Sequence, residues 1–314
     1  MKQFTSVHDV PDLKKLIALA REGKAKPKAN ATFGEGKAVC LLFLNPSLRT
    51  RLSTQRAAAH LGLTCMVMDV GRDGWQLEFE DGVVMNGHKA EHVREAAQVV
   101  SQYCDVIGLR TFSALKNQEE DYSEPVLSTF RKYATVPVLS LESAIRHPLQ
   151  SLTDLITIEE HVTIPNPKIV LSWAPHPRAL PQAVANSFAE WTRAAGHKIT
   201  IACPQGFELS EEFSNGHTVM HNQDEALANA DIVYTKNWSS FKDYGTIGSG
   251  FEDWQITAQK MALTNKAKFM HCLPVRRNVV VSDEVIESTN SLVFAQADNR
   301  TWAAKAVLQS LLDD

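Results

Sequence analysis

The sequence predicts an α/β fold made of two doubly wound parallel-sheet lobes that are linked by crossing helices. Short β-branched or apolar runs alternate along the chain with longer amphipathic stretches, as strands alternate with helices in such folds. The length of 314 residues is enough for two domains with separate cores. With 44% hydrophobic and 22% charged residues, the composition is globular and excludes collagen-like and mostly disordered classes.

Eight runs have the length and composition of buried strands, and four amphipathic stretches between them have helical spacing. The predicted strands are residues 38–44, 64–69, 104–109, 136–141, 168–173, 198–203, 231–235 and 268–273. The predicted helices are residues 52–61, 90–103, 125–133 and 180–195. This alternation favours parallel sheets with helices on both faces.

A proline-bounded crossover near the middle predicts the domain boundary. His147-Pro148 opens a helical stretch to about residue 161, and Ile164-Pro165-Asn166-Pro167 precedes the next strand. We therefore expect a first domain over residues 1–147 and a second over residues 148–297. Apolar residues at helical spacing, among them Ala303 and Val307, predict that residues 298–314 pack back on the first domain.

Charge, hydropathy and cysteine spacing exclude several classes of partner. The formal net charge of −4 argues against nucleic-acid binding. The longest apolar run, residues 38–44, is too short to cross a bilayer, and residues 1–4 lack the apolar core of a signal peptide. The five cysteines form no CxxC pair, which favours reduced, buried thiols. We expect a cytoplasmic protein without membrane contact.

Three segments that follow predicted strands carry the chemistry. The first segment is Ser47-Leu48-Arg49-Thr50-Arg51, in which two hydroxyls, a guanidinium and the start of a helix come together. These are the groups that bind a phosphate, and a plain helix cap is the alternative. In the segment 147–154, the imidazole of His147 and the amide of Gln150 can bind the carbonyl and NH2 groups of a ligand. The alternative is that His147 forms its hydrogen bonds within a loop and binds no ligand. In the segment 271–277, a proline turn favours backbone contacts to a ligand, and Cys272 is better explained as an inert thiol than as a nucleophile.

Taken together in this order, the motifs resemble those of the aspartate/ornithine carbamoyltransferase family. They are Ser47-Leu48-Arg49-Thr50-Arg51, Arg110 after a strand, His147-Pro148-Leu149-Gln150, His271-Cys272-Leu273-Pro274 and Ala297-Asp298-Asn299-Arg300. The resemblance spans nearly the whole chain, and five motifs in register are far more specific than any one of them.

The resemblance implies that the first domain binds carbamoyl phosphate, that the second binds the acceptor, and that a homotrimer shares its active sites. It implies no cofactor and no metal. The residues expected to bind carbamoyl phosphate are Ser47, Leu48, Arg49, Thr50, Trp75, Arg110, His147, Gln150, Cys272, Leu273 and Arg300. Arg49, Thr50, Arg110 and His147 would be catalytic. Trp75 resembles a loop residue that family members insert into a neighbouring subunit, with simple anchoring at a subunit contact as the alternative.

One departure from the ornithine enzymes of the family concerns the acceptor. Those enzymes carry an acid where Lys236 stands here. Two like charges near 4 Å repel by about 1 to 4 kcal/mol, so Lys236 disfavours the α-ammonium of free ornithine. Acylation removes that charge and leaves a carboxylate. The resemblance therefore implies an N-acylornithine acceptor, contacted by Glu142, His176, Lys236 and Arg276; surface ion pairing is the alternative role for Lys236 and Arg276.

Ala90 bears on the acyl group. Family members that use the acetyl compound carry a glutamate at the aligned position, whereas alanine leaves room for a succinyl arm and adds no negative charge. The expected acceptor is N-succinyl-L-ornithine, giving N-succinyl-L-citrulline in arginine biosynthesis. N-acetyl-L-ornithine is the alternative, and succinyl-type relatives usually have proline rather than alanine here.

Two further hypotheses come from other classes. His88-Lys89-Ala90-Glu91-His92 spells the H-x-x-E-H motif of a zinc hydrolase, but Asn86-Gly87 place His88 before the helix in which both histidines would have to align. A non-catalytic module that binds a phosphorylated ligand is the other hypothesis. No complete dinucleotide fingerprint or P-loop is present in the sequence, so nucleotide-dependent functions are not expected.

Overall fold

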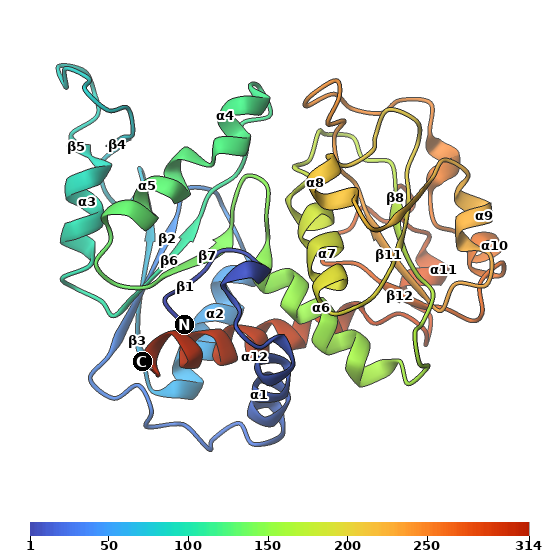
Figure 1. Cartoon of the computed structure of the whole chain (residues 1–314), viewed down its shortest axis with the longest axis horizontal. Coiled ribbons are helices and arrows are strands. Elements are labelled where there is room, and N and C mark those ends of the chain that lie inside the picture. Colours follow the sequence, from blue (N-terminus) through green and yellow to red (C-terminus); the bar gives the residue numbers. More distant parts are fainter. Residues whose placement is uncertain (314) are drawn as a thin grey trace. The chain divides into compact units, whose positions relative to one another are not determined.

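The computed structural model describes residues 1–313, and the chain forms two compact units (Figure 1). Unit 1 comprises Met1–Ala114, Glu119–Leu149 and the segment from Arg300 onward. Unit 2 comprises Leu115–Gln118 and Gln150–Asn299. Apart from the short segment Leu115–Gln118, the chain passes from one unit to the other inside two helices, α6 (Pro148–His161) and α12 (Val293–Leu312). The predicted segment 298–314 includes Asp314, which lies outside the described residues.

Unit 1 is built on a five-stranded parallel sheet with the order β1-β7-β6-β2-β3. The strands are β1 (Gln3–Phe4), β2 (Ala38–Phe43), β3 (Thr64–Asp69), β6 (Val106–Arg110) and β7 (Val138–Glu142). Strands β6 and β7 are buried along their whole length and β2 along nearly all of it, which explains why they read as continuous apolar runs.

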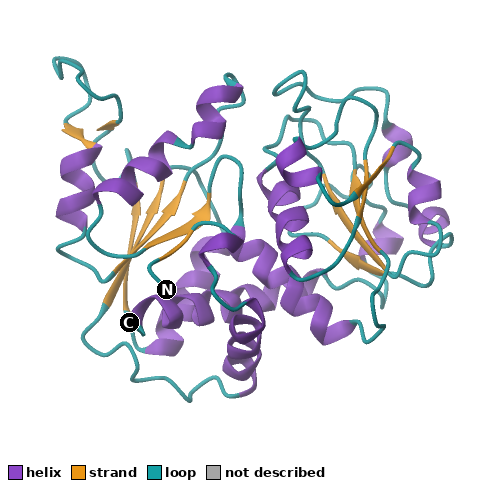
Figure 2. Cartoon of the chain, in the orientation of Figure 1, coloured by secondary structure: helices purple, strands orange, loops and turns teal. Residues whose placement is uncertain are grey.

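Helices cover both faces of the unit 1 sheet (Figure 2). On one face, α3 (Val93–Val100) and α5 (Pro125–Tyr133) pack in a core that includes Leu42, Ile107 and Phe130. On the other face lie α1 (Leu13–Ala25), α2 (Arg49–Leu61) and the second half of α12. The ring of His60 in α2 contacts that of Trp302 in α12 in a tilted arrangement, with the ring centroids 4.9 Å apart. The remaining elements of this region are α4 (Gln118–Ser123), β4 (Leu77–Glu78), β5 (Glu91–His92) and a 3-10 turn at Val7–Asp9.

Unit 2 repeats the design with the order β10-β9-β8-β11-β12, again all parallel. Its strands are β8 (Ile169–Trp173), β9 (Thr200–Ala202), β10 (Thr218–Met220), β11 (Ile232–Lys236) and β12 (Lys268–Met270). Its helices are α7 (Ala183–Ala194), α8 (Glu211–Ser214), α9 (Gln223–Leu227), α10 (Ala258–Met261) and α11 (Asp283–Ile286), with a 3-10 turn at Glu252–Trp254. Phe188 of α7 stacks on Tyr234 of β11 at 4.5 Å and joins helix to sheet.

The order of strands places a switch point in each sheet. In unit 1 the chain runs outward in opposite directions from the adjacent strands β2 and β6, and in unit 2 from β8 and β11. Open α/β sheets bind ligands at the carboxyl ends of strands at such points. The Ser47 turn follows β2 and Arg110 ends β6, whereas Lys236 ends β11 next to the loop that follows β8.

Several predicted boundaries were wrong for local reasons. The predicted helix 90–103 begins only at Val93, because Glu91 and His92 pair with β4. Helix α12 begins at Val293, ahead of the predicted residue 298. Helix α1 and the two-residue strand β1 were not predicted; β1 is too short to leave a periodic pattern.

No helix within residues 1–313 combines the length and apolar character needed to cross a membrane.

Candidate active site

The Ser47 turn lies where β2 gives way to α2. Helix α2 begins at Arg49, and its N-cap residue is Leu48, whose side chain has no oxygen with which to cap the helix. The alternative in which Ser47 serves as a plain cap therefore does not hold. A phosphate bound at this helix start would accept hydrogen bonds from N–H groups of the first turn and benefit from the helix dipole.

Arg110 connects this turn to two other predicted site residues. One terminal nitrogen, Nη1, donates to the carbonyl oxygens of Asn45 and Pro46 at 3.0 and 2.6 Å. The other, Nη2, donates to Oε2 of Glu142 at 2.9 Å, and Nε2 of His147 lies 3.6 Å from the same oxygen. All three ionisable side chains are buried, with 4 to 8% of their surface exposed. The arrangement brings a guanidinium, a carboxylate and an imidazole together at the carboxyl ends of β6 and β7.

Arg300 joins the same unit from the far end of the sequence. Its Nη2 donates to Oγ1 of Thr50 at 2.6 Å, across 250 positions of the chain. Both side chains are buried. Thus Thr50, Arg110, His147 and Arg300 lie in one unit with Ser47, Leu48 and Arg49 beside them in the chain, as a phosphate site requires.

Gln150, Cys272 and Leu273 belong to unit 2, where a buried hydrogen-bond chain holds the turn at residues 271–274. Asp154 Oδ1 accepts from Nε2 of Gln150 at 2.7 Å and from Nε2 of Gln296 at 2.6 Å. Gln296 Oε1 in turn accepts from the N–H of His271 at 3.0 Å. Burial raises the pKa of Tyr234 well above its ordinary value, and the neighbouring Asp154 acts in the same direction.

Leu273 occupies an unusual backbone conformation in this turn. Its φ of 52° lies in the left-handed region, which costs a residue other than glycine free energy. The N–H of Leu273 donates to Nδ1 of His271 at 2.8 Å, which fixes the conformation. Strained backbone held by its surroundings is typical of binding sites.

The network residues Asp154 and Gln296 were not among the predicted site residues. The sequence does contain a signal for this network, because four polar residues lie in an otherwise apolar stretch of helix α6: Ser151, Thr153, Asp154 and Thr157. In the structure all four are fully buried. Buried polar groups on a helix require partners, so such a run predicts a polar network.

We expect Asp154→Leu to destabilise the protein and displace the 271–274 turn. The substitution removes the shared acceptor of Gln150 and Gln296, and each stranded amide costs about 1 to 3 kcal/mol. Urea unfolding measures the loss in free energy of unfolding. Asp154→Asn, which keeps one acceptor oxygen, should lose less. A loss for Asp154→Leu equal to that for Asp154→Asn would contradict this role.

The predicted acceptor residues of unit 2 gather at its switch point. Burial lowers the pKa of His176, and the positive charges of Lys236, Arg276 and Arg178 lower it further. Lys236 pairs in register with Trp173, and its carbonyl accepts the N–H of Ala174 at 3.2 Å, so the loop that carries His176 starts beside it. His176, Lys236 and Arg276 are thus brought together, whereas Glu142 belongs to unit 1 with Arg110.

Trp75 and Ala90 lie on an exposed loop of unit 1 closed by the β4–β5 ladder. The Trp75 side chain is 60% exposed, and its Nε1 donates to Oε2 of Glu91 at 2.7 Å. The hydrogen bond from Lys89 Nζ, with two backbone N–H groups, lowers the pKa of Glu78 to about 2. Ala90 is exposed, and its N–H donates to the carbonyl of Gln76 at 3.2 Å. The loop therefore presents Trp75 on an ordered frame.

The H-x-x-E-H segment does not form the helix on which a zinc hydrolase depends. His88 lies in an exposed bend, and the carboxylate of Glu91 accepts a hydrogen bond from the indole of Trp75. Nε2 of His92 lies 3.1 Å from the carbonyl oxygen of Glu80. The two histidines therefore do not share a helical face, which i,i+4 zinc ligands require.

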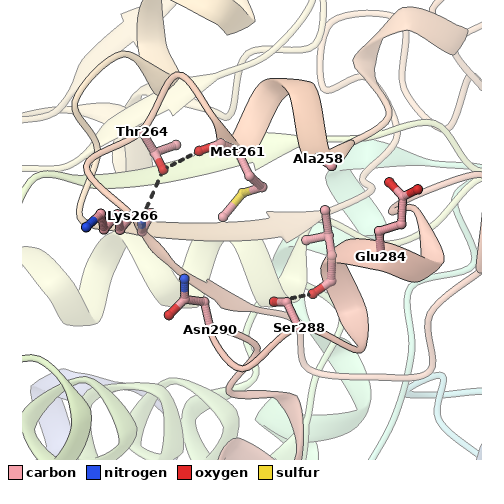
Figure 3. Close-up of a pocket in the computed structure, with 9 residues that line it drawn as sticks. Ala258, Met261, Thr264, Lys266, Glu284, Ser288 and Asn290 are labelled. Carbon is pink, nitrogen blue, oxygen red and sulfur yellow. Dashed lines mark hydrogen bonds between the residues drawn. The ribbon is translucent and has the colours of Figure 1, made fainter.

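A separate cavity of about 160 Å³ lies in unit 2 between α10 and α11 and contains none of the predicted site residues (Figure 3). Its hydroxyl groups are used within the walls: Thr264 Oγ1 donates to the Met261 carbonyl at 2.6 Å, and Ser288 Oγ to the Val285 carbonyl at 2.8 Å. We therefore do not assign the substrate site to it.

Comparison with known proteins gives a match over both units. The model of the aspartate/ornithine carbamoyltransferase carbamoyl-P binding domain matches residues 2–160, and that of the Asp/Orn binding domain matches residues 181–311. The N-succinylornithine carbamoyltransferase of Bacteroides thetaiotaomicron is 47% identical over 315 aligned residues, which cover 100% of this chain and 99% of the relative.

Solved structures agree with the sequence relatives. Acetylornithine transcarbamylase complexed with acetylcitrulline is 35% identical, with a TM-score of 0.94 and coverage of 99% of both chains. An N-acetyl-L-ornithine transcarbamylase variant with a glutamate-to-alanine substitution, complexed with carbamyl phosphate and N-succinyl-L-norvaline, has the same identity and TM-score, over 99% of this chain and 100% of that one. The two-lobed α/β prediction is confirmed, and the chain belongs to the aspartate/ornithine carbamoyltransferase family.

Proposed function

We propose that this enzyme transfers the carbamoyl group of carbamoyl phosphate to the δ-amine of N-succinyl-L-ornithine, giving N-succinyl-L-citrulline and phosphate. The observation that carries the acceptor assignment is the cluster of His176 with Lys236 and Arg276 at the β8–β11 switch point. This group attracts carboxylates and repels the α-ammonium of free ornithine.

Carbamoyl phosphate suits the groups of unit 1. Its phosphate is matched by the start of α2 and by Arg49, Arg110 and Arg300, and its carbonyl oxygen by Thr50, Arg110 and His147. Gln150 and the backbone of Cys272 and Leu273 would hold the carbamoyl NH2 group. The neutral δ-amine attacks the carbonyl carbon, the bond to the phosphate oxygen breaks, and the leaving phosphate takes the amine proton. Catalysis then rests on positioning and on donors aimed at developing charge.

Glu142 is suited to orient the attacking amine. In the structure its carboxylate forms an ion pair with Arg110. When Arg110 binds carbamoyl phosphate, that ion pair would weaken and the carboxylate would be available to the amine. The δ-amine would then donate a hydrogen bond to the carboxylate of Glu142.

We also propose that the enzyme works in the cytoplasm as a homotrimer in which the loop of Trp75 and Ala90 completes the site of a neighbouring subunit. The exposure of Trp75 on an ordered frame supports this role, because a large exposed indole is suited to burial against another surface. Dispersed cysteines without disulfides in residues 1–313 fit a reducing compartment.

Initial rates with free ornithine, N-acetyl-L-ornithine and N-succinyl-L-ornithine, measured side by side with carbamoyl phosphate, test the function. We expect the succinyl compound to give the highest kcat/KM and free ornithine the lowest. The acetyl compound is the second candidate, because structural neighbours of this chain are acetylornithine enzymes. A preference for acetyl would establish that candidate, and a preference for free ornithine would overturn the acceptor assignment.

We expect the affinity for N-succinyl-L-norvaline to rise as the pH falls from about 8 to 6. The pKa of His176 lies below its ordinary value without ligand, and a bound carboxylate raises it, so binding takes up a proton. The ligand carboxylates, with pKa values near 4, stay ionised throughout. Calorimetry across this range measures the slope, which His176→Gln should flatten. Affinity that falls toward pH 6 would contradict the linkage.

A further inference from the structure

We infer that Arg178 is a specificity-determining residue that binds the distal carboxylate of the succinyl group. This inference rests on the proposed function, which places an N-acylornithine at the β8–β11 switch point. Arg178 lies on the loop that follows β8, two residues beyond His176.

The backbone of Arg178 is held rather than loose. Nδ1 of His176 lies 3.1 Å from the N–H of Arg178 and 2.9 Å from its carbonyl oxygen. The imidazole thereby closes a tight turn and fixes the start of the Arg178 side chain, which is exposed to solvent. The N–H of Ala174, at the base of this loop, donates a hydrogen bond to the carbonyl oxygen of Lys236. The turn that carries Arg178 therefore starts beside β11.

The cluster is short of negative charge. Within residues 1–313, no ion pair engages Arg178, Lys236 or Arg276. Arg277, the next residue in the chain, is different: its guanidinium is paired with Asp283 at 2.7 Å and with Glu287 at 2.6 Å. Three cations without carboxylates around one imidazole repel each other, and an anionic ligand relieves that repulsion.

The count of charges points to a second carboxylate. N-acetylornithine carries one carboxylate, and N-succinylornithine carries two. Lys236 and Arg276 suffice for the α-carboxylate, which leaves Arg178 for the distal one. A guanidinium matches a carboxylate in a two-point geometry that neither an amide nor a methyl group reproduces.

Binding of two analogues tests this inference separately from catalysis. Calorimetry in the presence of carbamoyl phosphate would compare N-succinyl-L-norvaline with its terminal amide, in the wild-type protein and in Arg178→Ala. We expect the wild type to prefer the carboxylate by about tenfold, and the variant to lose that preference while its affinity for the amide stays within about twofold. Arg178→Lys should recover part of the preference.

Arg277→Ala is the matched control, since it removes one exposed guanidinium from a neighbouring loop that is already ion-paired. It should keep the wild-type preference. An unchanged preference in Arg178→Ala, or an equal loss in Arg277→Ala, would overturn the assignment of Arg178. Failure of the proposed function looks different: the wild type would then carbamoylate no N-acylornithine at all, whatever the binding of the two analogues.

Discussion

Arg110→Met is expected to lower kcat by at least about 10²- to 10³-fold, the cost of removing one donor that stabilises a developing oxyanion. We place Arg110 on both the phosphate and the carbonyl oxygen of carbamoyl phosphate. Its hydrogen bonds to the carbonyl oxygens of Asn45 and Pro46 also hold the turn before α2. Steady-state rates with saturating N-succinyl-L-ornithine measure the loss.

The substitution also strands a buried charge, so stability must be separated from catalysis. Removing one partner of a buried ion pair costs about 3 to 5 kcal/mol, and Glu142 would be left without Arg110. The double variant Arg110→Met with Glu142→Gln removes both charges and should recover much of the stability, as read by thermal unfolding. It should not recover turnover. Near-normal kcat in Arg110→Met would exclude Arg110 from the reaction.

Ala90→Glu should shift the acceptor preference from the succinyl toward the acetyl compound by tenfold or more. A carboxylate placed near 4 Å from the succinyl carboxylate repels it by about 1 to 4 kcal/mol, and tenfold corresponds to about 1.4 kcal/mol. Folding should be unaffected, because Ala90 is exposed and only its backbone is bonded, to Gln76.

Val84→Glu provides the control for Ala90→Glu. Val84 is 77% exposed on the same loop, so the variant adds the same charge without entering the proposed acyl site. The ratio of kcat/KM for the two acylornithines should change only in Ala90→Glu. Equal shifts in both variants would mean that any added negative charge on the loop has this effect. No shift in either variant would show that Ala90 does not determine the acceptor preference.

The strands and the α/β class could be predicted because buried parallel strands leave continuous apolar runs, as Val106–Arg110 and Ile169–Trp173 do. Segments with weak periodicity failed: Glu91 and His92 read as helix but pair with Leu77 and Glu78, a contact that no local pattern encodes. Resemblance to a family supplied the predicted site residues, whereas the partners of those residues depend on strand register. The pairing of Arg110 with Glu142 follows from β6 lying beside β7 with a bulge, 32 residues apart.

The acceptor side shows the same limit. The charge of Lys236 could be interpreted from its place at a strand end, because an acid there would suit ornithine and a base suits a carboxylate. The presence of Arg178 among the same cations depends on the turn that His176 closes, which the sequence does not reveal. Asp154 was missed likewise, since its partner Gln296 lies 142 positions away.

A crystal structure of the protein with carbamoyl phosphate and N-succinyl-L-norvaline would show which side chains bind the acceptor. We expect a ligand carboxylate within about 3 Å of Lys236 Nζ, and the phosphate in contact with the start of α2, Arg49 and Arg110. A structure in which Lys236 touches no part of the acceptor analogue, or in which an acidic side chain lies beside the α-nitrogen of the analogue, would disprove the proposed acceptor site.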